Sequence, residues 1–258
     1  MEWPIETLVL LCLGFFVVAT LYSSVGFGGG SSYLALLALS LGGFFAIRSL
    51  ALVCNLIVVS GSSYLYFKNG HLKLRDFLPF ILASIPLAFI GASFRLDEYI
   101  FFILLGSSLV ISAIFLAWQS WSGKKRKAHQ KSYPTYLSYV IGGAIGLLSG
   151  LVGIGGGIFL SPVLNHLRWG PPIKIAALAS FFIWVNSLSG IAGLVQGDML
   201  RLPLVETAAL AISVLIGGQL GIRISLKRLT PNGIKGVTAL LVFVVGIRIL
   251  IKYLPEIH

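Results

Sequence analysis

Long apolar stretches separated by short polar ones make up most of the chain. Five stretches precede a polar, basic segment at 120–134, and five follow it. They lie at roughly 5–22, 31–42, 46–67, 77–94 and 99–118, and then at roughly 136–150, 158–167, 174–195, 203–222 and 234–251. Most have the roughly 20 residues that a helix needs to cross the hydrocarbon. The pattern predicts an all-α membrane protein with one transmembrane repeat at 1–119 and another at 135–258.

The second segment of each half is short and directly follows a cluster of glycines. Residues 26–30 read Gly-Phe-Gly-Gly-Gly, and residues 153–157 read Gly-Ile-Gly-Gly-Gly. A glycine inside a helix costs about 1 kcal/mol relative to alanine, so we expect the helices to break here. Segments 31–42 and 158–167 are then either short tilted spans or re-entrant half-helices.

A constant offset of 127 relates the two halves. It maps the first glycine cluster onto the second and continues over some 65 residues. The further pairs are Gly43 with Gly170, Ser60 with Ser187, Ser62 with Ser189, Gly70 with Gly197, and Gly91 with Gly218. We infer an internal duplication joined by the linker at 120–134.

Composition agrees with a membrane protein. Of the 258 residues, 57% are hydrophobic and 10% are charged, and the mean hydropathy is +0.96, which no soluble domain of this size matches. We interpret the first segment as a retained helix and not as a signal peptide. The net charge of +11 lies in short loops, where it sets topology, and does not indicate nucleic-acid binding.

Basic residues predict that the linker is cytoplasmic, because Lys and Arg are enriched in cytoplasmic loops. With five crossings per half, most of the 19 basic residues fall on the linker side. The exceptions are Arg48, Arg95, Arg201, Arg248 and Lys252. Eight spans with re-entrant short helices would weaken this bias. An odd number per half makes the repeats inverted, which brings matching helix breaks together at the midplane. Three crossings plus a re-entrant hairpin per half would have the same parity.

The glycine clusters are the candidate substrate site. Glycines allow a ligand close to the backbone, and N–H groups at a helix start favour anions. We expect Ser31 or Ser32 to cap one short helix, and Ser161 with Pro162 to form the N-cap and N1 of the other. The candidate substrate-binding residues are Ser23, Ser24, Gly28, Gly29, Gly30, Ser31, Ser32, Asn55, Gly155, Gly156, Gly157, Ser161, Pro162 and Asn186.

Helix packing is the alternative interpretation of these residues. Small residues four apart let membrane helices approach closely, and packing is the favoured interpretation for Gly142, Gly146, Gly217 and Gly221. Asn55 and Asn186 line a pathway or join helices by hydrogen bonds. A dinucleotide-binding loop is disfavoured, because no βαβ unit fits.

All eight acidic residues fall in loops or near segment ends. Proton-driven carriers usually keep an ionisable group deep in the membrane, and intramembrane enzymes need catalytic or metal-binding groups there. The sequence therefore predicts neither an enzyme nor a cofactor or metal site, and disfavours a carboxylate-based cation site.

Residues 150–164 read Gly-Leu-Val-Gly-Ile-Gly-Gly-Gly-Ile-Phe-Leu-Ser-Pro-Val-Leu. This motif, with paired clusters in a duplicated membrane protein, resembles the TauE/SafE sulfite exporter family, also called the toluene-sulfonate uptake permease family. The first cluster departs from the family pattern, since Ser-Ser-Tyr-Leu-Ala follows it and no proline appears. The resemblance implies transport of sulfite or organosulfonates across a bacterial inner membrane, in a fold usually described with seven to nine spans.

Together these features predict a secondary transporter of a small oxyanion that works by alternating access. An anion channel and a non-transport membrane scaffold, in which the glycines serve packing alone, are the alternatives. The substrate, the direction, the coupling ion and the oligomeric state do not follow from the sequence.

Overall fold

The computed structural model describes residues 3–24, 26–40, 44–72, 74–121, 133–225 and 231–254. Over these residues the chain forms ten α-helices and no strand. The helices are α1 (Ile5–Ser23), α2 (Gly30–Ser40), α3 (Phe44–Lys68), α4 (Leu74–Ser93), α5 (Glu98–Trp121), α6 (Thr135–Val152), α7 (Gly157–Leu167), α8 (Pro172–Gln196), α9 (Leu204–Ser225) and α10 (Pro231–Tyr253). The predicted all-α class and its ten helical segments are confirmed. Most of the 120–134 linker, and Gly43 of the repeat pattern, lie outside the described residues.

Within the described residues, seven helices are long and apolar enough to cross a membrane, namely α1, α3, α4, α5, α6, α8 and α9. The helices α2 and α7 have 11 residues each. At 1.5 Å per residue they are about 16 Å long, roughly half the hydrocarbon thickness. Neither is long enough to cross by itself.

The first short helix folds back along the helix before it. The rings of Phe15 and Tyr33 stack at 4.5 Å between centroids, and Tyr22 Oη lies 2.7 Å from Ser32 Oγ. Later residues of α1 thus face earlier residues of α2, as in an antiparallel hairpin. Most residues of α2 are buried, so this hairpin carries its glycine tip into the protein interior.

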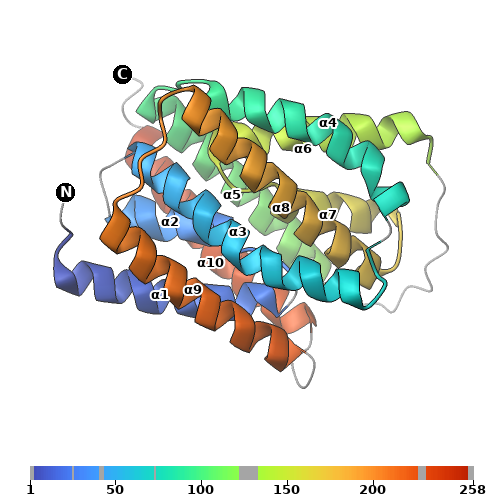
Figure 1. Ribbon diagram of the computed structural model, residues 1–258, viewed down its shortest axis with the longest axis horizontal. Helices are drawn as coiled ribbons and strands as arrows, with labels where there is room; N and C mark the ends of the chain where they lie inside the picture. The colour runs from blue at the N-terminus through green and yellow to red at the C-terminus, as the bar shows by residue number, and fades with distance from the viewer. Residues whose placement is uncertain are drawn as a thin grey trace.

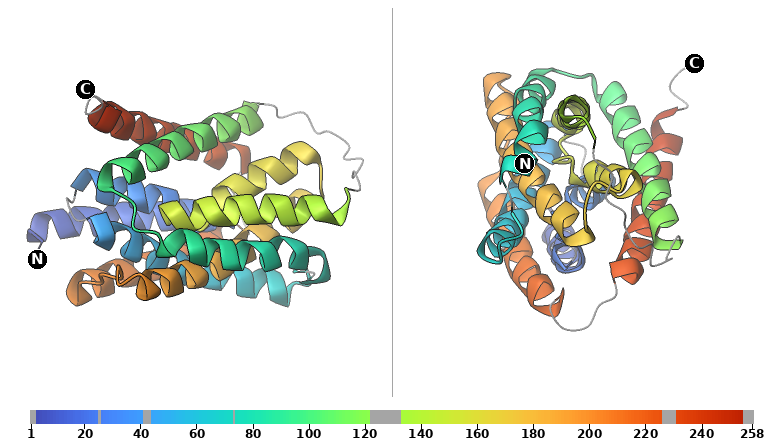
Figure 2. Two further views of the ribbon diagram at one scale, coloured as in Figure 1. Left: turned by 90° about the horizontal axis from the view of Figure 1, so that it is seen from above. Right: turned by 90° about the vertical axis from the view of Figure 1, so that its right-hand side faces the viewer.

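The long helices pack in pairs around the short ones. Helix α4 lies along α6, α5 along α10, α1 along α9, and α3 against α8 (Figure 1). Figure 2 shows that both ends of the chain lie at one end of the bundle, whereas α5 ends and α6 begins at the other. The short helices α2 and α7 contact α3 and α8 respectively.

The predicted helix caps are wrong. Helix α7 begins at Gly157, with Gly156 as its N-cap, and Ser161 and Pro162 lie inside the helix. Gly156 has φ = 80°, a left-handed conformation that glycine adopts without strain, so the helix can start at the cluster itself. Helix α2 likewise begins at Gly30, which places Ser31 and Ser32 in its first turn and not at the cap.

Candidate functional site

Two glycine loops, one from each half, interrupt the helices. Positive φ angles occur at Gly26 and Gly29 in the first loop, and at Gly153, Gly155 and Gly156 in the second. Non-glycine residues strongly disfavour this region, which explains why both breaks are made of glycine. Residues 26–30 and 153–157 are called the first and second glycine loops below.

Asn55 of α3 joins the two loops. Its Oδ1 accepts a hydrogen bond of 3.2 Å from the Gly30 N–H, and its Nδ2 donates one of 2.9 Å to the Ile154 carbonyl. The side chain is completely buried. The Asn55 side-chain amide therefore provides a hydrogen-bond partner both for the N–H group at the start of α2 and for a carbonyl of the second loop. The two clusters meet at this side chain in the protein interior.

The glycines around Asn55 have no room for side chains. A Cβ on Gly28 would overlap Asn55 Oδ1, and one on Gly30 would lie 2.6 Å from the Ile154 oxygen. A Cβ on Gly155 would lie 2.5 Å from Asn55 Nδ2 and 3.2 Å from Ser187 Oγ. Close approach of backbone to polar side chains thus requires glycine at these positions.

Helix α8 also holds the first loop. Ser180 Oγ donates a hydrogen bond to the Gly26 carbonyl, 154 positions away in the chain. Ser180 is completely buried. Each glycine loop is therefore tied by hydrogen bonds to a residue of the opposite half: the first loop to Ser180 and the second to Asn55.

Several buried polar atoms beside the loops have no hydrogen-bond partner within the described part of the chain. Tyr33 Oη, Ser149 Oγ and Ser187 Oγ belong to this group. Each lies near a loop glycine, since the residues stand within 3.2 Å of a Cβ built on Gly29, Gly156 or Gly155 respectively. Buried polar groups without partners are rare in native proteins. These three hydroxyls therefore keep the capacity to bond a polar ligand or water.

Arg48 lies near the start of the predicted segment 46–67, and the charge count assigned it to the side of the membrane opposite the linker. The structure buries it completely in α3. Its Nη2 donates to the Gly150 carbonyl at 2.8 Å and the Ala92 carbonyl at 3.4 Å. The guanidinium lies 5.9 Å from the centroid of the Phe101 ring.

Some of the sequence-predicted residues belong to this meeting point, and others do not. Gly28, Gly30 and Gly155 lie against Asn55. A Cβ on Gly29 would instead meet Tyr33, and one on Gly156 or Gly157 would meet Phe182 or Ile183 of α8. Ser31 and Ser32 face the Tyr22 hydroxyl, at 3.5 and 2.7 Å.

The remaining predicted residues bond elsewhere. Ser23 Oγ donates to the Gly218 carbonyl of α9, and Ser24 Oγ to its own helix at Leu21. Ser161 bonds Asn165 within α7, beside the buried Pro162. Asn186 Nδ2 donates to the Phe182 carbonyl, and its Oδ1 has no partner among the described residues. Sequence reasoning missed Arg48, Tyr33 and Ser149. Of these, Arg48 had a usable signal, since it precedes Asn55 by seven residues and so shares its helix face.

Another set of glycines lies between paired helices. Gly142, Gly146 and Gly150 of α6 face α4, where an added Cβ would clash with the backbone of Phe80, Ser84 or Ala88. Gly217 and Gly221 of α9 face α1 in the same way, against the carbonyls of Phe16 and Thr20. These five, called the packing glycines below, confirm the predicted helix-packing role of Gly142, Gly146, Gly217 and Gly221.

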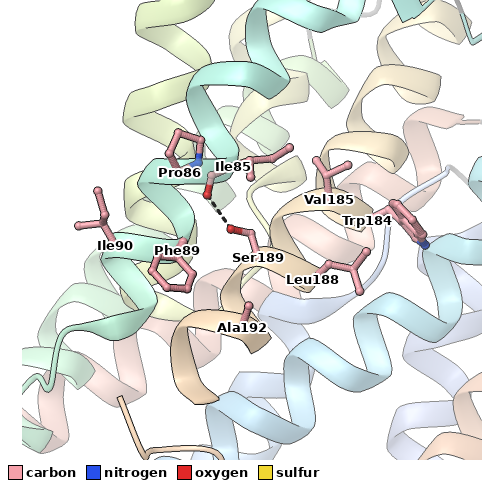
Figure 3. Close-up of a pocket in the computed structure, with 9 residues that line it drawn as sticks. All are labelled: Ile85, Pro86, Phe89, Ile90, Trp184, Val185, Leu188, Ser189 and Ala192. Carbon is pink, nitrogen blue, oxygen red and sulfur yellow. Dashed lines mark hydrogen bonds between the residues drawn. The ribbon is translucent and has the colours of Figure 1, made fainter. Parts of the chain in front are cut away.

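An apolar groove of about 660 Å³ runs between α4 and α8 (Figure 3). Its walls include Pro86, Phe89, Trp184 and Leu188, and Ser189 Oγ donates to the Ile85 carbonyl across it at 2.6 Å. No residue of either glycine loop lines it. Its lining does not suit an anion, so we do not assign the substrate site to it.

Comparison with known proteins identifies the family. The model described as sulfite exporter TauE/SafE matches residues 10–249. The chain is 32% identical to the probable membrane transporter protein y4hK of Sinorhizobium fredii over 244 residues, which cover 93% of this chain and 97% of the relative. It is 28% identical to the probable membrane transporter protein MJ0441 of Methanocaldococcus jannaschii over 268 residues, covering 95% and 96%. No solved structure matches the chain. This multi-pass membrane protein belongs to the TauE/SafE family of membrane transporters.

Proposed function

We propose that the protein is a secondary transporter of a small oxyanion, sulfite or an organosulfonate, and that it works by alternating access across the bacterial inner membrane. The observation that carries the proposal is the meeting of the two glycine loops at Asn55. Broken membrane helices that meet between two repeats are the usual construction of a transporter site. In this proposal the loop N–H groups, the neighbouring hydroxyls and the Asn55 amide bind the anion oxygens.

The helix pairing supports two halves related by a twofold axis. Under the 127-residue offset α1 corresponds to α6, and each later helix follows in order. The pair α4–α6 then becomes α9–α1, and α4–α8 becomes α9–α3, while α5–α10 and α3–α8 map onto themselves. All of these pairs are in contact. The chain ends and the α5–α6 ends lie at opposite ends of the bundle (Figure 2), as inverted repeats require.

Charged residues support the orientation. By their places in connections and at helix ends, the acidic residues Glu6, Asp97, Glu98, Asp198 and Glu206 lie at the bundle end that holds the chain termini, together with the basic residues Arg95, Arg201, Arg248 and Lys252. The end at which α5 stops and α6 starts carries Lys68, Arg75, Arg168, Lys174 and Arg223 with Asp76. The excess of basic residues comes from the sequence of the linker at 120–134, which contains Lys124, Lys125, Arg126, Lys127 and Lys131. We therefore infer that the linker, and with it the end at which α5 stops and α6 starts, is cytoplasmic.

An anion suits the site better than a cation. Every described Asp and Glu lies in a connecting segment or in the first turn of a helix. Glu206, in the first turn of α9, is buried with 7% exposure, but it lies near the bundle end. The groups beside the loops are amide N–H groups and hydroxyls, together with the Arg48 cation. Such groups can donate hydrogen bonds to oxyanion oxygens.

The test is flux in proteoliposomes of purified protein, with sulfite, methanesulfonate, sulfate and acetate as candidates. We expect saturable uptake of sulfite or methanesulfonate and stimulation of uptake by the same anion loaded inside. Protein-free liposomes set the background. Unsaturable flux without such counterflow would favour a channel, and background flux for all four anions would contradict the proposal.

A further inference from the structure

Among the Lys and Arg side chains whose burial the structure describes, that of Arg48 is the only buried one. A cation inside a membrane protein is costly and is usually retained for a function. The groups that surround its guanidinium therefore indicate what that function is.

One nitrogen of the Arg48 guanidinium, Nη2, has a structural role. Its Nη2 donates to carbonyls in the last turns of α4 and α6, at Ala92 and Gly150. A cation is favourable at the C-terminus of a helix, where carbonyls lack intrahelical partners. This role uses a single amino group of the guanidinium.

The rest of the guanidinium has no such explanation. Nε and Nη1 are buried and have no hydrogen-bond partner within the described part of the chain. None of the described Asp or Glu side chains forms an ion pair with Arg48. Apart from the Phe101 ring, whose centroid lies 5.9 Å from the guanidinium carbon, the described residues offer no partner for these N–H groups, which are left to bind something from outside the protein.

The position of Arg48 connects it with the glycine loops. Its Cβ and Cγ lie 3.5 Å from a Cβ built on Gly153, at the start of the second loop. Asn55 follows seven residues later on the same helix face, about 10 Å along the axis, and bonds Ile154 of the same loop. Arg48 and Asn55 thus flank the second loop.

We propose that Arg48 binds the transported anion through Nε and Nη1, an inference that rests on the proposed transport function. The planar guanidinium donates pairs of N–H groups that match the oxygens of sulfonate-like anions. In the described conformation the side chain is completely buried. The anion therefore reaches it when the two halves move apart during transport.

The charge of this site also defines its substrate. One buried cation balances one negative charge, whereas a dianion would carry a second charge into a low-dielectric interior. The site therefore selects singly charged oxyanions, such as sulfonates and hydrogen sulfite, over sulfate.

The experiment measures methanesulfonate uptake by wild type and by Arg48→Gln in proteoliposomes, with sulfate as competitor. Loss of a charged hydrogen-bond donor raises the KM for methanesulfonate about 10- to 100-fold, and excess sulfate leaves wild-type uptake unchanged. Arg201→Gln is the matched control, because that side chain is 57% exposed and bonds its neighbour Leu200. It keeps the wild-type KM.

Folding is followed by size-exclusion elution and thermal unfolding in detergent. If Arg48→Gln does not fold, Arg48→Lys decides the matter: it keeps the charge but not the planar donor pairs, and raises KM with Vmax preserved. An unchanged KM in a folded Arg48 variant, or equal competition by sulfate, overturns the role of Arg48. If wild type moves none of the anions, the proposed function itself fails.

Discussion

The packing glycines of α6 and α9 face backbone atoms of α4 and α1, whereas Gly28 and Gly155 of the two loops face the polar side chain of Asn55. Gly146 would place a Cβ 2.6 Å from the Ser84 Cα, in regular helix on both sides. Gly155 would place it 2.5 Å from Asn55 Nδ2, in a backbone with φ = 84°. Both glycines leave no room for a Cβ, but the lack of space has a different consequence in each region. In the pairs it holds the scaffold together, and in the loops it shapes a polar centre.

This difference predicts that substitutions of the packing glycines lower the stability of the fold more than substitutions of the loop glycines do. In Gly146→Leu the added side chain forces α6 away from α4, and we expect a loss of about 3 kcal/mol or more of stability, at the upper end of overpacking effects. Thermal unfolding in detergent and the yield of monodisperse protein measure it. Gly218→Ala is the control, because its Cβ would contact Val58 at an ordinary 3.6 Å. Wild-type stability in Gly146→Leu would remove the distinction between the two regions.

A charge placed between the loops should abolish transport of anions. Asn55→Asp keeps an acceptor for the Gly30 N–H, loses the donor to Ile154, and adds a negative charge in a buried position. Electrostatic repulsion in a low-dielectric site is strong, so we expect at least about a 100-fold loss of sulfite or methanesulfonate uptake. Asn55→Gln, which stays neutral, serves as the comparison. Retained uptake in Asn55→Asp would exclude Asn55 from the anion path.

Loop substitutions should reduce transport more than stability. Gly28→Ala displaces the Asn55 amide from the first half, and Gly155→Ala does so from the second. Each substitution disturbs a hydrogen bond to the anion or to the loop, so we expect uptake to fall about 10-fold or more. The loss of uptake should be of similar size in the two variants. Parallel unfolding curves and uptake assays test this. Unfolding without a selective loss of uptake would assign the loop glycines to packing alone.

The smallest effect is expected at the bundle end that holds α5–α6. There Lys174 Nζ lies 2.6 Å from Asp76 Oδ2 and 4.6 Å from the centroid of the Trp169 ring. Both charged side chains are partly exposed, and such pairs contribute about 0–1 kcal/mol. Asp76→Asn should change stability within that range, with less effect at high salt. A loss comparable to that of Gly146→Leu would show that this ion pair holds the two halves together.

Local sequence information predicted much of this molecule. Hydrophobic runs located all ten helices, and the glycine clusters located both breaks, because hydrocarbon burial and glycine conformation act over a few residues. Asn55 was identified because a buried amide needs partners. Ser161 and Pro162 gave a wrong prediction of where α7 begins. Both residues are typical of a helix start, but the N-cap is Gly156 in a left-handed conformation.

What could not be predicted depends on helix contacts far apart in the chain. The carbonyl partners of Arg48 lie 44 and 102 positions away, and Ser23 turns to α9 and not to the loops. No local pattern contains this information. The pairing of α4 with α6 and of α1 with α9 likewise appears only once the helices are assembled.

In the proposed mechanism the two glycine loops and Asn55 together bind the anion. Crystals grown with selenite, a heavier analogue of sulfite, would locate the anion directly through the anomalous signal of selenium. We expect a selenium peak within hydrogen-bonding reach of Asn55 and both loops, with Arg48 facing it. A peak in the α4–α8 groove of Figure 3, or none between the loops at saturating selenite, would contradict it.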